Sequence, residues 1–131
     1  MKNLYKRILF TVTVLLALSG AVKAQSALED VTNGVRTGNV ALIAPYFDNV
    51  VPITMNNTLS TYSRTQAEMI LKDFFTRNMP KELMVANSGT SNNAKFVIGE
   101  LMTTTGKYSV YILLKEKEHV FYLQELRLNK E

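Results

Sequence analysis

The chain has 131 residues, 47% of them hydrophobic, with a formal net charge of +4 and no cysteine. The lack of cysteine excludes disulfides, thiolate nucleophiles and cysteine-based metal sites. The positive charge does not indicate a nucleic-acid-binding protein, because the excess lies in residues 1–24, which hold four basic residues and no acid. The remaining segment has 11 of the 15 basic residues against 11 acidic ones, without the basic stripe that phosphate backbones require.

The N-terminal segment has the pattern of a secretory signal peptide. Its sequence, MKNLYKRILFTVTVLLALSGAVKAQ, places basic residues before an apolar run over 8–18 and small residues around Ala24. We predict a signal peptide over 1–24, cleavage after Ala24 and a single domain over 25–131 that is periplasmic or extracellular. The apolar run is shorter than the roughly 18 residues of a membrane span, so no stable membrane anchor is expected. An uncleaved anchor or a buried helix is the alternative.

The first part of the domain has the period of a helix. Leu28, Val31 and Val35 fall on one stripe and Gly38 supplies a stop, because glycine accepts a left-handed backbone at little cost. A very short second helix is expected over 40–46.

The clearest helix is predicted within residues 63–80. Ser63 and Gln66 have the spacing of a capping box, and Glu68 and Lys72 can pair one turn apart on the exposed side. The apolar face of this helix consists of Ala67, Ile70, Leu71, Phe74 and Phe75.

Strands are predicted on both sides of this helix. Residues 50–55 and 58–62 form a hairpin around two asparagines, and Pro52 predicts that the first of these strands lies at a sheet edge. Residues 87–93 are expected to form a polar loop. The further strands are predicted over 83–86, 95–104, 108–115 and 120–128. Helices followed by mostly antiparallel strands indicate an α+β fold, with the N-terminal helices packed on a curved antiparallel sheet.

The last two strands carry apolar residues on both faces. Tyr108, Val110, Ile112 and Leu114 share one face. On the other face, Tyr111, Leu113, Phe121 and Leu123 are predicted to form an apolar patch. Large exposed patches usually mark interfaces, so we expect a homodimer or a contact with another envelope protein. The alternative is that the N-terminal helix covers the patch.

The segments TGNVALIAPYFDNVVPI, YSRTQAEMILKDFF and FVIGELMTTTGKYSVYILLK resemble a family of secreted bacterial proteins known as a domain of unknown function, within the nuclear-transport-factor-2-like (cystatin-like, SnoaL-like) superfamily. The resemblance implies a cone-shaped fold in which Tyr46 and Phe47 close the open end. It also implies pairing through the open face of the sheet. It brings no established activity and no cofactor.

Some members of this superfamily are isomerases or dehydratases with Asp, His or Tyr deep in the cone. His119, the single histidine, lies in the charged segment KEKEH and is expected at the surface, so neither a Ser-His-Asp set nor a metal site is predicted. Glu100 and Gln124 interrupt apolar strand faces, and with Tyr62 they are candidate ligand-binding residues. The alternative is a strand bulge or an open rim. We therefore predict a non-catalytic domain that binds a partner or a small apolar ligand, with an isomerase or dehydratase as the second hypothesis.

Overall fold

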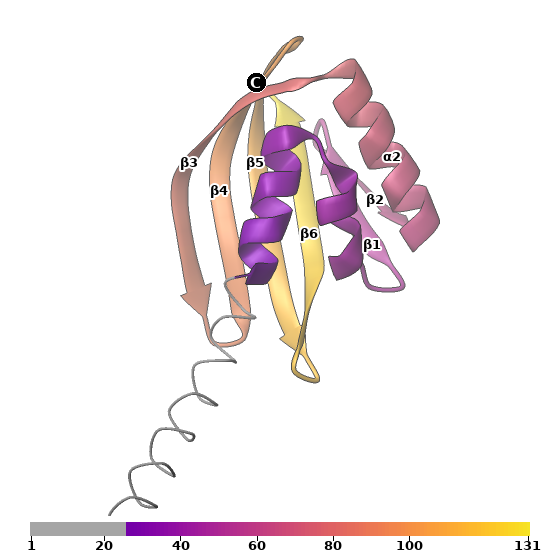
Figure 1. Cartoon of the computed structure of the whole chain (residues 1–131), viewed down its shortest axis with the longest axis vertical. Coiled ribbons are helices and arrows are strands. Elements are labelled where there is room, and N and C mark those ends of the chain that lie inside the picture. Colours follow the sequence, from indigo (N-terminus) through magenta and orange to yellow (C-terminus); the bar gives the residue numbers. More distant parts are fainter. Residues whose placement is uncertain (1–25) are drawn as a thin grey trace, which may run out of the picture.

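The computed structural model describes residues 26–131, in which helices cover one face of a curved six-stranded sheet (Figure 1). The predicted signal peptide lies outside these residues. Within them, no helix has the length and apolar character needed to cross a membrane. The predicted α+β class is confirmed.

The helical segments follow the sequence signals closely. The first helix runs over residues 26–37, and Gly38 ends it with a φ of 69°. The short helix expected over 40–46 forms as two 3-10 turns, η1 (Val40–Leu42) and η2 (Ala44–Tyr46). The side chain of Asn39 caps η1 by accepting a hydrogen bond from the backbone N–H of Ala41 at 3.1 Å.

Helix α2 (Arg64–Arg77) begins at the predicted capping box. The Ser63 hydroxyl accepts from the Gln66 backbone at 3.2 Å, and the Gln66 side chain accepts from the Ser63 backbone at 3.1 Å. Glu68 and Lys72 form the expected ion pair at 3.8 Å. The apolar face predicted for this helix is buried except for Ile70, which is half-buried.

The sheet contains six strands in the order β2-β1-β6-β5-β4-β3. Their bounds are β1 (Val51–Met55), β2 (Thr58–Tyr62), β3 (Pro80–Ser91), β4 (Ala94–Thr103), β5 (Gly106–Lys117) and β6 (Val120–Lys130). All neighbouring pairs are antiparallel except β1 and β6, which run parallel. The parallel pair brings the first strand of the chain beside the last.

Strand β1 lies inside the sheet, so the prediction that Pro52 marks an edge strand is wrong. The register with β6 starts at Ile53, one residue after the proline, while Pro52 itself faces Thr61 of β2. Proline is therefore tolerated at the entry to the paired segment. As predicted, Asn56 and Asn57 form the hairpin turn, both with positive φ.

Strand β3 corrects a second prediction. Residues 87–93 were expected to form a polar loop, but β3 continues through them to Ser91 and pairs with β4 along its whole length. It is an edge strand in which Leu83 is the single buried residue, so its sequence carries no alternation of apolar and polar side chains.

The core fills the space between the helices and the sheet. The first helix contributes Val31 and Val35, and both are fully buried against the inner sheet residues. Phe47 is also buried, and the partly buried Tyr46 packs against the core. The inner face of the sheet contributes Val97, Leu101, Tyr108, Val110, Ile112, Leu114, Leu123, Leu126 and Leu128.

Candidate functional site

The structure does not bring the three predicted ligand-binding residues together. Glu100 lies on β4, on the face away from the helices, and its carboxylate is 3.5 Å from the Lys107 ammonium. Gln124 is exposed on β6, and Tyr62 is half-buried at the end of β2, which three other strands separate from β4. The sequence alternative of a bulge or an open rim describes Glu100 and Gln124 better than a shared pocket does.

The sheet surface opposite the helices, which we call the open face, carries apolar side chains on neighbouring strands with ion pairs between them. The pairing register places Ile98 opposite Tyr111 and Phe96 opposite Leu113, all pointing away from the core. Ile98 is 42% exposed and Met84 on the neighbouring strand is 54% exposed. The open face consists of Met84, Phe96, Ile98, Met102, Tyr111, Leu113 and Tyr122.

A bulge in β6 moves two of the predicted interface residues to the other side of the sheet. Leu113 pairs with Glu125 and Leu114 pairs with Leu123, so Gln124 is the extra residue. Leu123 is therefore only 1% exposed and belongs to the core, and Phe121 packs against the core as well. Tyr111 and Leu113 remain on the open face as predicted.

The charged groups of the open face already have partners in the same chain. Glu125 accepts hydrogen bonds from Arg127 at 2.5 and 3.2 Å, and the guanidinium lies 5.1 Å from the centre of the Tyr111 ring. The hydrogen bond and the charge of Glu125 raise the pKa of Arg127 above its ordinary value. Lys107 is paired with Glu100. These two pairs carry no net charge.

The helix side has a hollow where the first helix, η2 and the β5–β6 hairpin meet, which we call the mouth. Its lining consists of Ser26, Ala27, Pro45, Tyr46, His119, Val120 and Phe121. The Tyr46 hydroxyl donates to Asp30 at 2.5 Å. Burial, followed by the hydrogen bond and the charge of Asp30, raises the pKa of Tyr46 to about 12. No sequence pattern links Asp30 and Tyr46, which are 16 positions apart.

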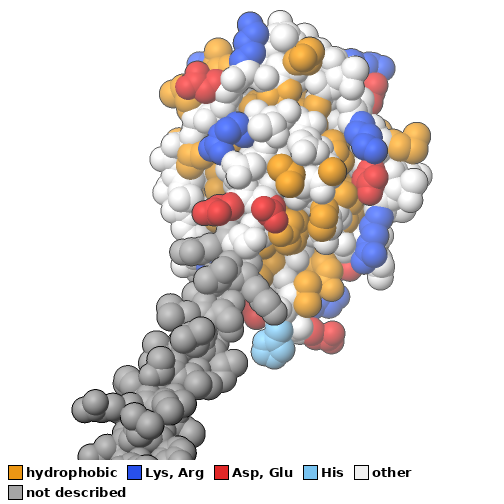
Figure 2. All heavy atoms as spheres, in the orientation of Figure 1, with side chains coloured by type: hydrophobic (Ala, Val, Ile, Leu, Met, Phe, Trp, Pro, Cys, Tyr) orange, Lys and Arg blue, Asp and Glu red, His pale blue; other side chains and the backbone are white. Residues whose placement is uncertain are grey.

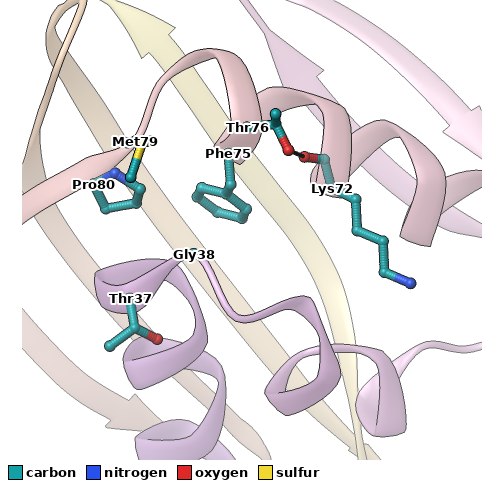
Figure 3. Close-up of a pocket in the computed structure, with 7 residues that line it drawn as sticks. All are labelled: Thr37, Gly38, Lys72, Phe75, Thr76, Met79 and Pro80. Atoms are coloured by element: carbon teal, nitrogen blue, oxygen red, sulfur yellow. Dashed lines mark hydrogen bonds between the residues drawn. The ribbon is translucent and has the colours of Figure 1, made fainter.

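A second hollow lies between the end of the first helix, α2 and the start of β3 (Figure 3). The ring of Phe75 forms its floor, whereas the Lys72 side chain points away along the helix. Lys72 is also paired with Glu68, and it borders a further hollow beside η2. This surface offers apolar contact but no unpaired charge.

Within residues 26–131 the interior holds no carboxylate, lysine or histidine, and its one ionisable group is the phenol of Tyr108, which donates a hydrogen bond to Asn78 at 3.1 Å. The buried polar residues there are Thr32, Thr54 and Thr103, and the Thr32 hydroxyl lacks a hydrogen-bond partner. The same part of the chain has no cluster of three or more His, Asp or Glu residues that could hold a metal. His119 is fully exposed in its turn, as predicted, 3.7 Å from Glu116.

These features define the class of the protein, a cone-shaped domain of nuclear-transport-factor-2-like fold. The chain is similar in structure to a nuclear-transport-factor-2-like protein of unknown function from Shewanella baltica OS155, with a TM-score of 0.60 and 11% identity over 85% of this chain and 95% of that one. This likeness confirms the fold that the sequence resemblance implied.

The family can also be stated. The model of the domain of unknown function DUF4783 matches residues 28–129, so the chain belongs to this family. Crystal structures of DUF4783 family proteins from Bacteroides uniformis ATCC 8492 and Bacteroides ovatus ATCC 8483 match with TM-scores of 0.74 and 0.73 and identities of 23% and 24%. The matches cover 79% and 77% of this chain and 95% and 92% of those chains. A comparison with curated proteins found no match.

Proposed function

We propose that this protein is an exported, non-catalytic interaction domain that pairs with a second copy of itself through the open face. The observation that carries the proposal is the group of apolar side chains on the side of the sheet that the helices leave uncovered, among them the exposed Met84 and Ile98. The first helix packs on the opposite face, where Val31 and Val35 enter the core. The alternative that this helix covers Tyr111 and Leu113 therefore has no support.

The composition of the open face suits an interface. Soluble proteins rarely expose large contiguous apolar patches without a binding role. Aromatic residues and methionine are enriched at interface centres, and the open face contains three aromatic residues and two methionines. Polar side chains such as Ser109, Lys115 and Asn129 border it and provide a rim.

The charge pattern favours a second copy over a charged partner. Glu100 pairs with Lys107 and Glu125 pairs with Arg127 within the chain, so these four charges on the open face do not by themselves select an oppositely charged surface. A two-fold contact places the same patch on both sides, and a neutral apolar patch is complementary to itself.

An isomerase or dehydratase is the second hypothesis from the sequence. Such an enzyme uses an acid or base whose pKa is shifted inside a dry pocket. Among the described residues no carboxylate or histidine is buried, and the buried phenol of Tyr108 is hydrogen-bonded to Asn78. We therefore prefer the binding function.

Two substitutions of the same kind test the proposal. Leu113→Glu places a charge on the open face, whereas Leu123→Glu places one in the core, ten residues further along the chain. We expect Leu113→Glu to give a folded monomer in sedimentation velocity with an unchanged circular dichroism spectrum. Leu123→Glu should unfold the protein, because an unpaired buried charge is strongly destabilising. A wild-type monomer, or a Leu113→Glu variant that stays dimeric, would refute the proposal.

A further inference from the structure

The mouth joins an apolar lining to a carboxylate at its edge. It has a cavity volume of about 420 Å³, comparable to the volume of a small organic ligand site. Val120 is 49% exposed there, next to the half-buried ring of Phe121. Figure 2 shows hydrophobic side chains gathered beside acidic ones on this side of the molecule, above the histidine. A ligand would therefore meet an apolar wall and a negative charge together.

The negative charge comes from Asp30. One of its carboxylate oxygens accepts the Tyr46 hydroxyl, and the other receives no hydrogen bond from residues 26–131. Lys117 lies 3.8 Å from Asp48 and offsets its charge, whereas His119, which lies 3.7 Å from Glu116, carries a positive charge only when it is protonated. Within residues 26–131, Asp30 forms no salt bridge with a lysine or an arginine.

Two further features bear on the sign of the charge that a bound ligand would carry. A helix carries about half a positive elementary charge at its N-terminus, which is less than the full charge of Asp30. The protein itself places a cation by a ring of the mouth, since the Lys95 ammonium is 6.0 Å from the centre of Phe121. Aromatic rings and a carboxylate both favour a positive group.

We propose that the mouth binds a small amphiphilic cation, with its apolar part against Val120 and Phe121 and its positive group beside Asp30. The site is separate from the open face and shares no residue with it. Failure of this proposal would therefore leave the proposed dimer untouched, and failure of the dimer would leave the mouth intact.

Three probes of equal chain length test the proposal: hexyltrimethylammonium, the neutral hexanol and the anionic hexanesulfonate. The protein is purified in the form that its host makes and titrated by NMR. We expect saturable binding of the cation with shift changes at Ala27, Tyr46 and Val120, weaker binding of the alcohol and the weakest binding of the anion. Equal affinity for cation and anion, or no saturable binding of the cation, would overturn the proposal.

Variants separate the charge from the apolar wall. Asp30→Asn keeps an acceptor for Tyr46 and should weaken cation binding about fivefold, the effect of roughly 1 kcal/mol, while leaving hexanol binding unchanged. Val120→Thr should weaken the cation and the alcohol alike. Asp73→Asn on α2, which removes an exposed carboxylate 3.1 Å from Arg77, is the matched control and should change neither. Cation affinity that is equal in wild type and Asp30→Asn would contradict the assignment.

Discussion

At the scale of single residues, the burial of Tyr46 and its hydrogen bond to Asp30 make the stability of the fold depend on pH in the alkaline range. The ordinary pKa of tyrosine is near 10, and in the folded protein it is raised to about 12. The unfolded chain therefore loses this proton first as the pH rises. The stabilisation is fully present below pH 10 and is lost between about pH 10 and pH 12.

Tyr46→Phe should reveal this dependence. We expect the variant to be less stable than wild type by about 1 kcal/mol at pH 8, because a partly exposed hydrogen bond to a carboxylate is lost. The difference should shrink as the pH approaches 12. Urea unfolding at several pH values measures it, and comparison with the variant cancels the titration of the other tyrosines. A difference that stays constant up to pH 12 would contradict the shifted pKa.

Gly99 shows a second effect of one residue, at the bulge between β3 and β4. A Cβ atom there would lie 2.5 Å from the backbone oxygen of Met84. Gly99→Ala should therefore cost about 1–3 kcal/mol, because backbone must move to accommodate the methyl group. In Gly89→Ala the nearest atoms belong to the Phe96 ring, at 2.9 Å, and a side chain can move more easily. Denaturant unfolding in which Gly89→Ala loses as much stability as Gly99→Ala would contradict this reading.

At the scale of elements, the bulge at Gln124 decides which side chains of β6 enter the core. Deleting Gln124 leaves Leu123 and Leu126 on the inner face, because Glu125 then separates them by one residue. We expect this deletion to fold with a cooperative transition. Deleting Arg127 instead turns Leu128 outward and should abolish folding. Circular dichroism and thermal unfolding distinguish the two, and an unfolded Gln124 deletion would contradict the assigned register.

The elements also show how far the sequence predicts this structure. Helix α2 follows from its capping box and its apolar face, since both signals are local. The continuation of β3 and the position of β1 are not predicted, because exposed polar strand residues and the parallel contact with β6 leave no local signal. Strict alternation along β6 placed Leu123 on the wrong face, since a one-residue bulge inverts everything beyond it.

Some residues of the candidate sites could be predicted from the sequence and others could not. Tyr111 and Leu113 were predicted on the outer face from alternation within a regular strand, and the structure places them there. The mouth was not predicted as a site, because Asp30 and Tyr46 meet only when the first helix and η2 pack together. Glu100 was selected as a polar interruption, but on the face away from the helices a charged side chain needs only the nearby Lys107.

At the scale of the whole molecule, the proposed export would change the net charge. If the signal peptide is removed after Ala24, the secreted chain begins at Gln25 and has equal numbers of acidic and basic residues. The intact mass of the protein recovered outside the cytoplasm measures this. We expect the mass of residues 25–131, and a product that keeps residues 1–24 would contradict both the export and the neutral charge.

The open face makes self-association the central claim about the whole molecule. Its apolar residues lose contact with water only when a second surface covers them, and the described helices lie on the other side of the sheet. Sedimentation equilibrium of the wild-type protein over a range of concentrations is the most direct measurement. We predict a mass twice that of the chain, shifting toward the monomer on dilution. A single monomer mass at every concentration, up to hundreds of micromolar, would contradict the account.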